Sequence, residues 1–308
     1  LLDPTLAEDA PPIHPDGNVI RRIHLRHGDQ EAASRSDLVS VEGTYEVGMQ
    51  DQAFMGPESG LAIPDGEGGV DLAVATQWLH TDRDQVAACL GLPAERVRLT
   101  LAGVGGAFGA REDISLHIHL CLLALHTGRP VKMCYSRDES FYGHVHRHPA
   151  RMWYRHYATS TGDLVRVEAR LLFDGGAYAS SSHHVIANAT CFAAGPYRVP
   201  SADIEGVVVR TDNPPCGAMR GFGAVQSCFA HEAQMDRLAA ALKMDPVALR
   251  RQNALASGDV IITGQRITGT LPVVEVLDAC AAHPSAAGGP NEPMSRPGGA
   301  GRTADVEH

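Results

Sequence analysis

The sequence predicts an α+β fold in which mixed sheets pack with helices. Strand-like alternation of apolar and polar residues and helix-like apolar spacing are mixed along the chain, without the strict strand–helix alternation of a parallel α/β protein. The 308 residues include 32 glycines and 19 prolines, so turns separate many short elements. A chain of this length can bury a sizeable core.

Composition narrows the classes of partner. The formal net charge is −10, which argues against a surface for nucleic acid or for an anionic membrane. No apolar run approaches the roughly 18 residues that a membrane-spanning helix needs. The seven cysteines form no CxxC pair, which indicates reduced thiols in a cytoplasmic protein. We therefore expect no nucleic-acid or membrane partner, and no iron–sulfur cluster held by closely spaced cysteines of this chain.

The first elements are predicted to be strands. Residues 18–26 form a strand, and a polar linker runs from 28 to 37. Residues 39–47 alternate between apolar and polar side chains, as a half-buried strand does. Residues 61–63 and 70–76 flank a turn rich in proline and glycine, so they are expected to form a hairpin.

Helix signals follow this hairpin. Thr81 and Asp82 can cap a short helix over residues 83–90, which Gly91 ends. Residues 114–125 alternate at first like a strand and then become continuously apolar. The length of this apolar segment favours a buried helix.

Turn and cap signals predict the remaining elements. The sequence at 160–163 is typical of a hairpin turn, and Asp245 followed by Pro246 is typical of a helix start. The expected strands are 96–102, 131–135, 151–157, 164–173 and 205–210, and the expected helices are 226–243 and 246–253.

A glycine-rich loop spans residues 104–112. Three glycines and two alanines surround Phe108, and Glu112 follows. Glycine permits positive φ and close approach of another group. A run of small residues that ends at a helix start presents N–H donors to an anionic or oxo-bearing cofactor. By itself the pattern also fits an ordinary turn between strand and helix.

Three further motifs accompany this loop, at residues 48–58 (GMQDQAFMGPE), 173–178 (FDGGAY) and 212–223 (DNPPCGAMRGFG). In this order and spacing, the four motifs resemble those of the large subunit of molybdenum hydroxylases. This is the xanthine dehydrogenase and aldehyde oxidoreductase family, and the resemblance runs over about residues 41–255. It implies the molybdenum-cofactor-binding domain fold of the xanthine dehydrogenase type.

The resemblance also divides the chain. It implies that residues 1–37 are the tail of a preceding α/β domain with its linker, and that residues 38–275 are a first molybdopterin-binding domain. Half of the residues from 284 to 301 are glycine or proline. Residues 276–308 are accordingly expected to be a linker into a second molybdopterin-binding domain.

The resemblance assigns cofactor contacts. Gln50, Phe108 and Arg220 are expected beside the molybdenum, against its ligands rather than bound to the metal. An amide can donate a hydrogen bond without adding charge, and arginine suits desolvated anions. The ordinary alternatives for these three residues are, in order, a polar loop residue, a core phenylalanine and a structural salt bridge. Gln52, two residues after Gln50, is a second candidate for its role. The full cofactor-binding set is Gln50, Gly106, Phe108, Gly109 and Arg220.

Three residues are assigned to the substrate. Glu112 can hydrogen-bond a heterocycle and follow its charge change in the transition state, and Phe222 can pack against an aromatic ring. For Glu112 the alternative is an acid favoured by the helix dipole at a helix start, and for Phe222 it is a phenylalanine of the core. Asn188 occupies the place of the family's second substrate arginine, so Glu112 favours a heterocycle whereas Asn188 favours an aldehyde. Gly221, where copper-dependent carbon monoxide dehydrogenases have cysteine, disfavours carbon monoxide.

The implied activity is that of a molybdenum-dependent oxidoreductase. The chain would be the molybdopterin-binding subunit that hydroxylates a purine-like N-heterocycle with oxygen from water. An aldehyde oxidoreductase-type subunit and a non-catalytic paralogue acting as scaffold are the alternatives. The resemblance implies molybdenum–molybdopterin, with its cytosine dinucleotide form among the options, and it places 2Fe–2S and FAD on partner chains of a hetero-oligomer.

The resemblance assigns no catalytic residue to this chain. The family's general-base glutamate is expected beyond residue 308, so the chain alone is expected to be inactive. A separate pattern is the alternation of His144, His146 and His148. On one strand these side chains would share a face and could bind zinc, but no fourth ligand lies beside them in sequence. Structural histidines are the favoured interpretation there and for His183 and His184.

Overall fold

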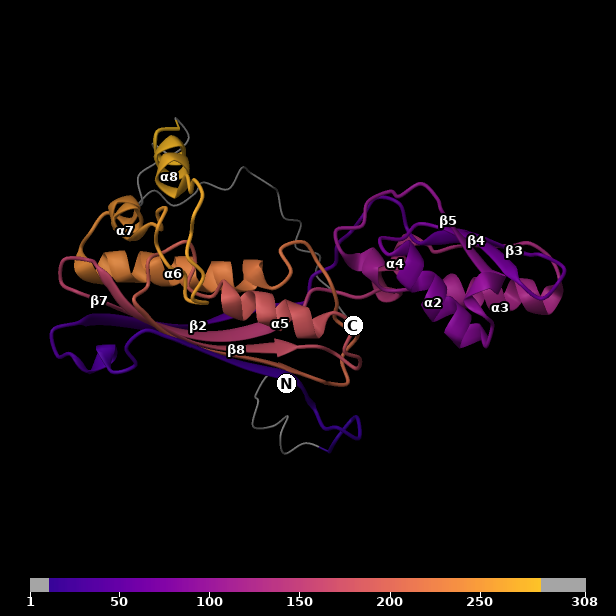
Figure 1. Ribbon diagram of the computed structural model, residues 1–308, viewed down its shortest axis with the longest axis horizontal. Coiled ribbons are helices and arrows are strands. Elements are labelled where there is room, and N and C mark those ends of the chain that lie inside the picture. The colour runs from indigo at the N-terminus through magenta and orange to yellow at the C-terminus, as the bar shows by residue number, and fades with distance from the viewer. Residues whose placement is uncertain (1–10, 284–308) are drawn as a thin grey trace, which may run out of the picture.

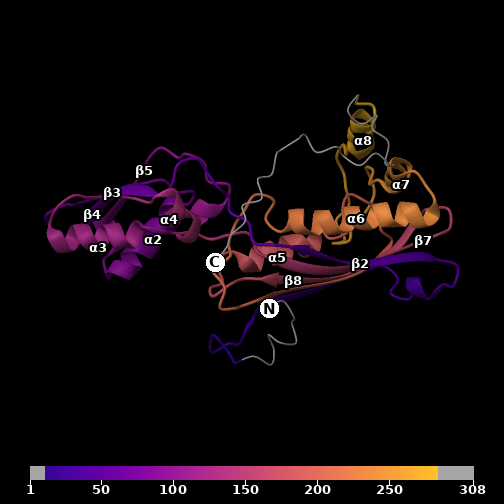
Figure 2. The same cartoon turned by 180° about the vertical axis from the view of Figure 1, so that it is seen from behind.

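The computed structural model describes residues 11–283, which form two lobes around two separate sheets. The large lobe contains a five-stranded sheet in the order β1-β9-β8-β7-β2, and the small lobe contains a four-stranded sheet in the order β5-β4-β3-β6. The lobes lie side by side along the longest axis of the molecule (Figure 1), and the view from behind shows the same separation (Figure 2). The predicted α+β class with mixed sheets and helices is confirmed.

The large lobe is a mostly antiparallel sheet with helices on one face. Only β8 and β9 pair in parallel, and helix α5 lies in the connection between them. Helices α5 and α6 cover the sheet, and α7 and α8 lie farther out (Figure 1). The elements are β1 Val19–His27, η1 Ala32–Ser34, β2 Val39–Val47, β7 Ala150–Ala158, β8 Leu164–Asp174, α5 Ser182–Cys191, β9 Ser201–Val209, α6 Ala224–Leu242, α7 Pro246–Asn253 and α8 Val273–Ala281.

The core of the large lobe lies between this sheet and its two covering helices. Met152 and Tyr154 from β7 and Ile204 from β9 are fully buried there, together with Leu238 from α6. A Cβ at Gly206 would collide with the Thr190 hydroxyl of α5. The absence of a side chain at Gly206 therefore lets α5 pack directly onto β9.

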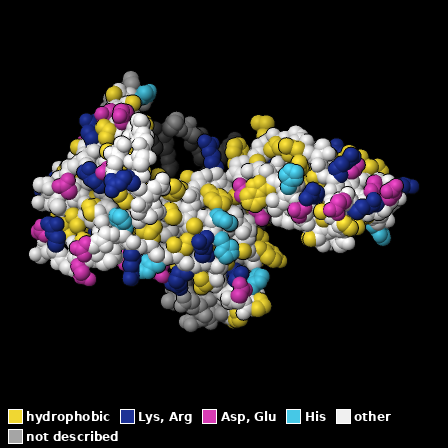
Figure 3. Space-filling view, in the orientation of Figure 1, with side chains coloured by type: hydrophobic (Ala, Val, Ile, Leu, Met, Phe, Trp, Pro, Cys, Tyr) yellow, Lys and Arg dark blue, Asp and Glu magenta, His cyan; other side chains and the backbone are white. Residues whose placement is uncertain are grey.

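The small lobe contains the second core. Leu72 of β4 and Leu120 of α3 are fully buried, and Val86 of α2 packs into the same cluster. Basic and acidic side chains are interspersed over the face of this lobe shown in Figure 3. The elements are β3 Ser59–Pro64, β4 Val70–Val74, α2 Leu79–Leu90, η2 Ala94–Arg96, β5 Val97–Leu101, η3 Ala110–Glu112, α3 His117–Thr127, β6 Val131–Cys134 and α4 Arg137–Tyr142.

Most predicted elements are present, and the ambiguous segment at 114–125 is a helix. It begins at His117 and ends before Gly128, which takes a left-handed conformation. Both predicted hairpins form, as β3–β4 and β7–β8. The capping role predicted for Thr81 and Asp82 is wrong, because α2 already begins at Leu79 and both residues lie inside it. Asp82 is buried and accepts a hydrogen bond from the Thr76 hydroxyl.

Three helices were not predicted. Helix α4 starts with a capping box in which the Ser136 hydroxyl accepts from the Glu139 amide and the Glu139 carboxylate accepts from the Ser136 amide. This Ser-x-x-Glu signal was readable in the sequence. Helices α5 and α8 have no side-chain cap, and α5 follows Ser180, whose φ is 41°. Their starts therefore carry no local signal of this kind.

Two predicted domain boundaries differ from the arrangement of the elements. Strand β1, placed by the sequence in the tail of a preceding domain, pairs with β9 from Val19 to His27 and belongs to the large sheet. Helix α8 crosses the expected boundary at residue 275, so residues 276–281 are helical rather than linker. The segment 284–301 lies outside the described residues. Between residues 11 and 283, no helix is long and apolar enough to cross a membrane.

Candidate functional site

Three of the sequence motifs meet at the junction of the two lobes. The Gly56 amide donates to the Gly105 carbonyl at 3.1 Å, which joins the loop after β2 to the glycine-rich loop. The Gln52 amide donates to the Ala218 carbonyl at 2.7 Å, which joins the loop after β2 to the loop before α6. Motifs that are more than 40 residues apart in sequence are thus in direct contact.

The glycine-rich loop packs against the loop before α6 without intervening side chains. Gly109 has a φ of 108°, and a Cβ there would lie 2.6 Å from the Ala218 carbonyl carbon. The Arg220 amide donates to the Phe108 carbonyl at 2.8 Å. Only glycine satisfies both the backbone angle and the close approach at position 109.

Two residues that sequence reasoning missed hold this loop in place. The Gln77 side-chain oxygen accepts from the Gly109 amide at 3.1 Å and from the Arg111 amide at 3.3 Å. The Arg111 side chain is 5% exposed and donates to the carbonyls of Gly106 (3.0 Å) and Gly56 (2.5 Å). Its guanidinium also lies 4.3 Å from the centre of the Phe54 ring. The carbonyl of Gly106 is thus engaged within the protein.

A cavity of about 770 Å³ lies where these loops meet. Four of the side chains predicted to bind cofactor or substrate line it, together with Gly109. These side chains are Phe108, Glu112, Arg220 and Phe222. A volume of this size suits a cofactor together with a small substrate. The remaining lining residues are Gln77, Trp78, Ser181, His184, Ala218 and Met219.

Among residues 11–283, Arg220 is the only arginine or lysine that lines this cavity. Its side chain is exposed, and within residues 11–283 its guanidinium makes no hydrogen bond or ion pair. The described residues therefore do not form the structural salt bridge that was the alternative role for Arg220. A free guanidinium beside a cavity can bind an anionic group.

Glu112 is the acid of this cavity, and its carboxyl group is half-buried. Burial and the neighbouring Asp113 carboxylate raise the pKa of Glu112. Asp113 itself faces away and accepts a hydrogen bond from the Ser180 hydroxyl at 2.8 Å. The two adjacent acids therefore have different surroundings, and Glu112 is the one that lines the cavity.

Asn188 lies behind Phe222 rather than beside Glu112. Its amide donates to the Phe222 carbonyl at 2.8 Å and to the Gly221 carbonyl at 3.4 Å. It lines a neighbouring cavity of about 560 Å³, which shares His184 and Phe222 with the first. The donors of Asn188 thus support the backbone of this loop, and its predicted contact with substrate stays a prediction.

Gln50 lies at the edge of the site. Its carbonyl accepts from the Arg147 amide at 2.9 Å, its side chain is exposed, and it is not among the lining residues of the large cavity. Arg147 is buried, and its guanidinium donates to the Arg220 carbonyl at 2.9 Å. Arg147, which the sequence analysis did not single out, therefore links the backbones of Gln50 and Arg220.

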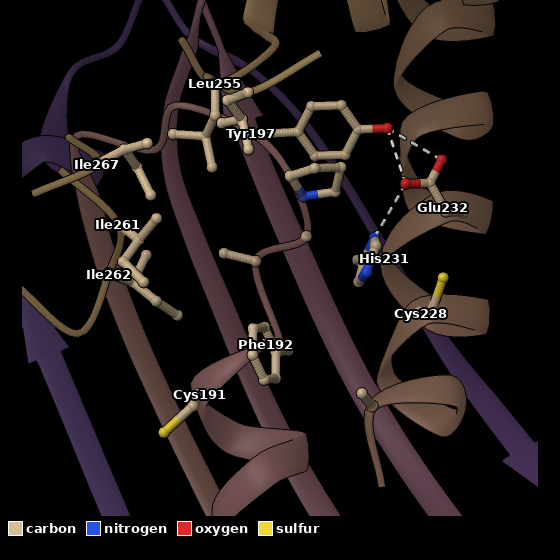
Figure 4. A pocket seen from close by; sticks show the side chains of 15 residues that line it. Cys191, Phe192, Tyr197, Cys228, His231, Glu232, Leu255, Ile261, Ile262 and Ile267 are labelled. Atoms are coloured by element: carbon tan, nitrogen blue, oxygen red, sulfur yellow. Dashed lines mark hydrogen bonds and ion pairs between the residues drawn. The ribbon is translucent and has the colours of Figure 1, made fainter. Parts of the chain in front are cut away.

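A further cavity of about 470 Å³ lies apart from the predicted site residues (Figure 4). Its walls are mainly apolar, with Ile261, Ile262 and Ile267 on one side. On the other side the Tyr197 hydroxyl donates to Glu232, which also contacts His231. None of the residues predicted to bind cofactor or substrate lines it.

Comparison with known proteins identifies the family. A family model described as the molybdopterin cofactor-binding domain matches residues 13–254. The chain belongs to this family. Its curated relatives include a xanthine dehydrogenase molybdenum-binding subunit and an aldehyde oxidoreductase, so the predicted membership of the molybdenum hydroxylases is confirmed.

The relatives differ in the substrate that their names state. The chain is 40% identical to the nicotinate dehydrogenase large molybdopterin subunit of Eubacterium barkeri, over 90% of this chain and 65% of the relative. It is 35% identical to a subunit of a probable xanthine dehydrogenase from Bacillus subtilis, over 91% of this chain and 37% of the relative. It thus spans less than two thirds of the length of either relative.

A solved structure shares the same fold. The aldehyde oxidoreductase from Desulfovibrio gigas superposes with a TM-score of 0.82 at 30% identity, covering 90% of this chain and 31% of that protein. The two lobes and their junction therefore have the fold of a molybdenum-cofactor-binding domain.

Proposed function

We propose that this chain is the molybdopterin-binding subunit of a molybdenum hydroxylase that hydroxylates a purine-like N-heterocycle. The observation that carries the proposal is the single cavity that combines Phe108, Glu112, Arg220 and Phe222. Iron–sulfur and FAD partner chains would accept the electrons in a hetero-oligomer, and the seven free cysteines support a cytoplasmic location. The 40% identity to a nicotinate dehydrogenase subunit supports an N-heterocycle over other substrate classes.

The residues at the cavity fit molybdopterin. The cofactor is anionic, and the Arg220 guanidinium is free within the described residues. Phe108 and Gly109 line the cavity, and the small residues of their loop, Gly106 included, leave room for a cofactor to approach the backbone closely. Gln50, Gly106, Phe108, Gly109 and Arg220 would hold the group, in its plain or its cytosine dinucleotide form.

The bound group would supply the two-electron oxidation, with water as the source of oxygen. The protein would bind and orient the substrate. Phe222 would pack against an aromatic ring, and Phe108 would exclude water from one side of the cavity. Glu112 would hold a proton to a ring nitrogen, and its raised pKa favours the protonated form that can donate one.

An aldehyde oxidoreductase-type subunit is the second candidate. The fold of the aldehyde oxidoreductase from Desulfovibrio gigas favours it, and so does the neutral Asn188 at the place of a substrate arginine. A non-catalytic scaffold is the third candidate, and the free Arg220 at the cavity opposes it, since a scaffold needs no such cation there. We expect the general base outside residues 1–308 and assign no catalytic residue within them.

Metal and pterin analysis of the full-length subunit, co-expressed with its partner chains, tests the proposal. We expect near-stoichiometric molybdenum and pterin in the wild type and a loss of most of both in Arg220→Ala. Arg129→Ala is the matched control, because Arg129 is an exposed arginine of the small lobe that does not line the cavity. A folded complex without molybdenum in the wild type would reject the hydroxylase and favour the scaffold.

A further inference from the structure

A second cluster of ligand-type side chains lies at the junction of the lobes, outside the cavity described above. Asp51, His144 and His146 each offer one ligand atom, and these atoms all lie within 4.8 Å of one another. Asp51 comes from the connection β2–β3, and the two histidines come from the connection α4–β7. These are the two connections through which the chain passes between the lobes (Figure 1).

The distances fit one shared metal ion. The Asp51 Oδ2 atom lies 2.9 Å from His144 Nε2 and 3.3 Å from His146 Nε2. A tetrahedral zinc ion with bonds of about 2.0–2.1 Å separates its ligand atoms by roughly 3.3 Å. Two of the three separations are thus close to those around such an ion, and the third is at most 4.8 Å.

Surrounding groups orient two of the three ligands. The Asp51 Oδ1 atom accepts from the Ala53 amide at 2.6 Å, which leaves Oδ2 to face the histidines. His144 Nδ1 lies 2.9 Å from a Glu58 carboxylate oxygen, so Nε2 is the atom directed at Asp51. A carboxylate behind a histidine is the usual support of a metal ligand, because it fixes the tautomer and raises ligand basicity.

The side chains of the cluster are mostly buried, and two of its three facing atoms lack hydrogen bonds within the described residues. The side chains of His144 and His146 are 3% and 10% exposed, and that of Asp51 is 18% exposed. Asp51 Oδ2 and His144 Nε2 are buried atoms that lie at ion-pair distance but make no hydrogen bond within the described residues. Buried polar atoms are nearly always satisfied, so an ion or a water is expected between them.

We propose that Asp51, His144 and His146 form a binding site for a divalent transition-metal ion of the Zn²⁺ type, separate from the molybdenum centre. Two imidazole nitrogens and one carboxylate oxygen favour such ions over Mg²⁺ and Ca²⁺, which prefer oxygen ligands. A water can take the fourth position through the partly exposed side of Asp51.

The alternating histidines, for which a structural role was favoured, do not all join this cluster. His148, predicted to share a face with His144 and His146, instead lies 2.8 Å from the Ser182 hydroxyl and does not join the cluster. The third ligand is Asp51, which lies more than 90 residues away in sequence. His146 Nε2 also lies 2.8 Å from the Phe141 carbonyl oxygen, so binding an ion requires the tautomer with the proton on Nδ1 and gives up that contact.

An ion at this site would act on the neighbouring loops. Asp51 directly follows Gln50, and the Gln50 carbonyl already accepts from the Arg147 amide, which directly follows His146 in the chain. The ion would clamp the Gln50 loop to the segment that precedes β7. It would thereby restrain the position of Gln50 without touching the large cavity.

Cobalt titration of the full-length chain tests this site, because Co²⁺ replaces Zn²⁺ and reports its geometry by absorbance. We would use chelator-treated protein from molybdenum-depleted cells. We expect one equivalent of Co²⁺ with a tetrahedral spectrum, displaced by Zn²⁺ and unaffected by Mg²⁺. Asp51→Asn and His146→Gln should weaken binding about 100-fold or more, whereas the matched control His126→Gln, at an exposed histidine of α3, should not.

Two results would overturn the proposal. One is a wild-type protein that takes up no Co²⁺ at micromolar concentration, since the cluster would then be an ion pair only. The other is unchanged uptake in both Asp51→Asn and His146→Gln. Circular dichroism identifies a variant that fails to fold, and a Zn²⁺-dependent rise in the melting temperature of the wild type, lost in whichever variant folds, gives an independent readout.

Discussion

Two phenylalanines at the large cavity have left-handed backbone angles. Phe108 has a φ of 53° and Phe222 a φ of 49°, and glycines with positive φ lie next to both. Such angles cost about 1–3 kcal/mol each for a residue with a Cβ. The hydrogen bonds from Arg220 to Phe108 and from Asn188 to Phe222 hold these segments in place. The strain is therefore concentrated where the proposed cofactor and substrate would bind.

Glu112 gives the residue-scale prediction, which separates the two substrate classes. In the complete enzyme, Glu112→Gln should lower kcat/KM for an N-heterocycle about 100-fold, because an amide can donate a hydrogen bond to the ring nitrogen but cannot transfer a proton to it. It should change kcat/KM for an aromatic aldehyde by less than about fivefold. Glu95→Gln, at an exposed acid of the small lobe, is the control. Equal losses for both substrates would contradict a role for Glu112 in recognising the heterocycle.

At this scale the sequence identifies motif residues but not their supports. Phe108, Glu112, Arg220 and Phe222 were predicted from the four motifs, and they line one cavity. The supporting residues Gln77, Arg111 and Arg147 were not predicted. Each acts through hydrogen bonds to backbone groups distant in sequence, such as Arg111 to Gly56. No local pattern encodes a contact of that kind, because the partner is a carbonyl that every residue has.

Among the elements, helices α6 and α7 are joined by a charged network at the wall of the apolar cavity. The Glu232 carboxylate accepts from the Tyr197 hydroxyl at 2.7 Å and from Arg250 Nε at 2.8 Å. Burial alone would raise the pKa of Glu232, but hydrogen bonds from His231, Arg250 and Tyr197 outweigh it and lower the pKa to about 2. The ionised form of Glu232 therefore stabilises the fold.

This network gives the element-scale prediction. Glu232→Gln should lower the free energy of unfolding by about 2 kcal/mol at pH 7. Because the pKa of Glu232 is lower in the folded chain than its usual value of 4.5, the contribution is complete above pH 4.5 and disappears as pH falls towards 2. Urea unfolding of wild type and variant between pH 7 and pH 3 measures this. Glu275→Gln, at an exposed acid of α8, should show no such difference, and a pH-independent gap would contradict the explanation.

Strands were easier to predict than helices in this chain. The alternation in residues 39–47 gave the bounds of β2, because one face of that strand is exposed and the other half-buried. Strand β9 begins at Ser201, four residues before its prediction, because almost all of its residues are buried and no alternation marks its start. Helices such as α5, which lack caps, are stabilised by packing on the sheet rather than by local signals.

For the whole molecule, the presence of two cores predicts unequal stability of the lobes. The cluster of the large lobe contains 25 buried residues and that of the small lobe contains 11. We expect amides of β3, β4 and α3 to exchange with solvent through openings of lower free energy than those of β7 and β8. Hydrogen–deuterium exchange read by mass spectrometry, peptide by peptide, measures both sets.

Matched core variants make this prediction specific. Val74→Ala should lower the opening free energy of the small lobe by about 2 kcal/mol and leave β8 unchanged, and Ile204→Ala should have the converse effect. The same exchange rate in both lobes, or equal responses to both variants, would show that the lobes unfold as a unit. The resemblance implied one molybdopterin-binding domain over residues 38–275, and hydrophobic patterns in the sequence do not report which strands share a sheet.

The pairing of β2 with β7 has a consequence for the order of folding. These neighbouring strands are separated in the chain by residues 48–149, which form the small lobe and its connections. Bringing the ends of so long an unstructured loop together is entropically costly and slow. Once the small lobe has folded, however, the contact between the Gln50 carbonyl and the Arg147 amide brings its two ends together. The inserted lobe then acts as a preformed turn, and the large sheet can close as if β2 and β7 were joined by a hairpin.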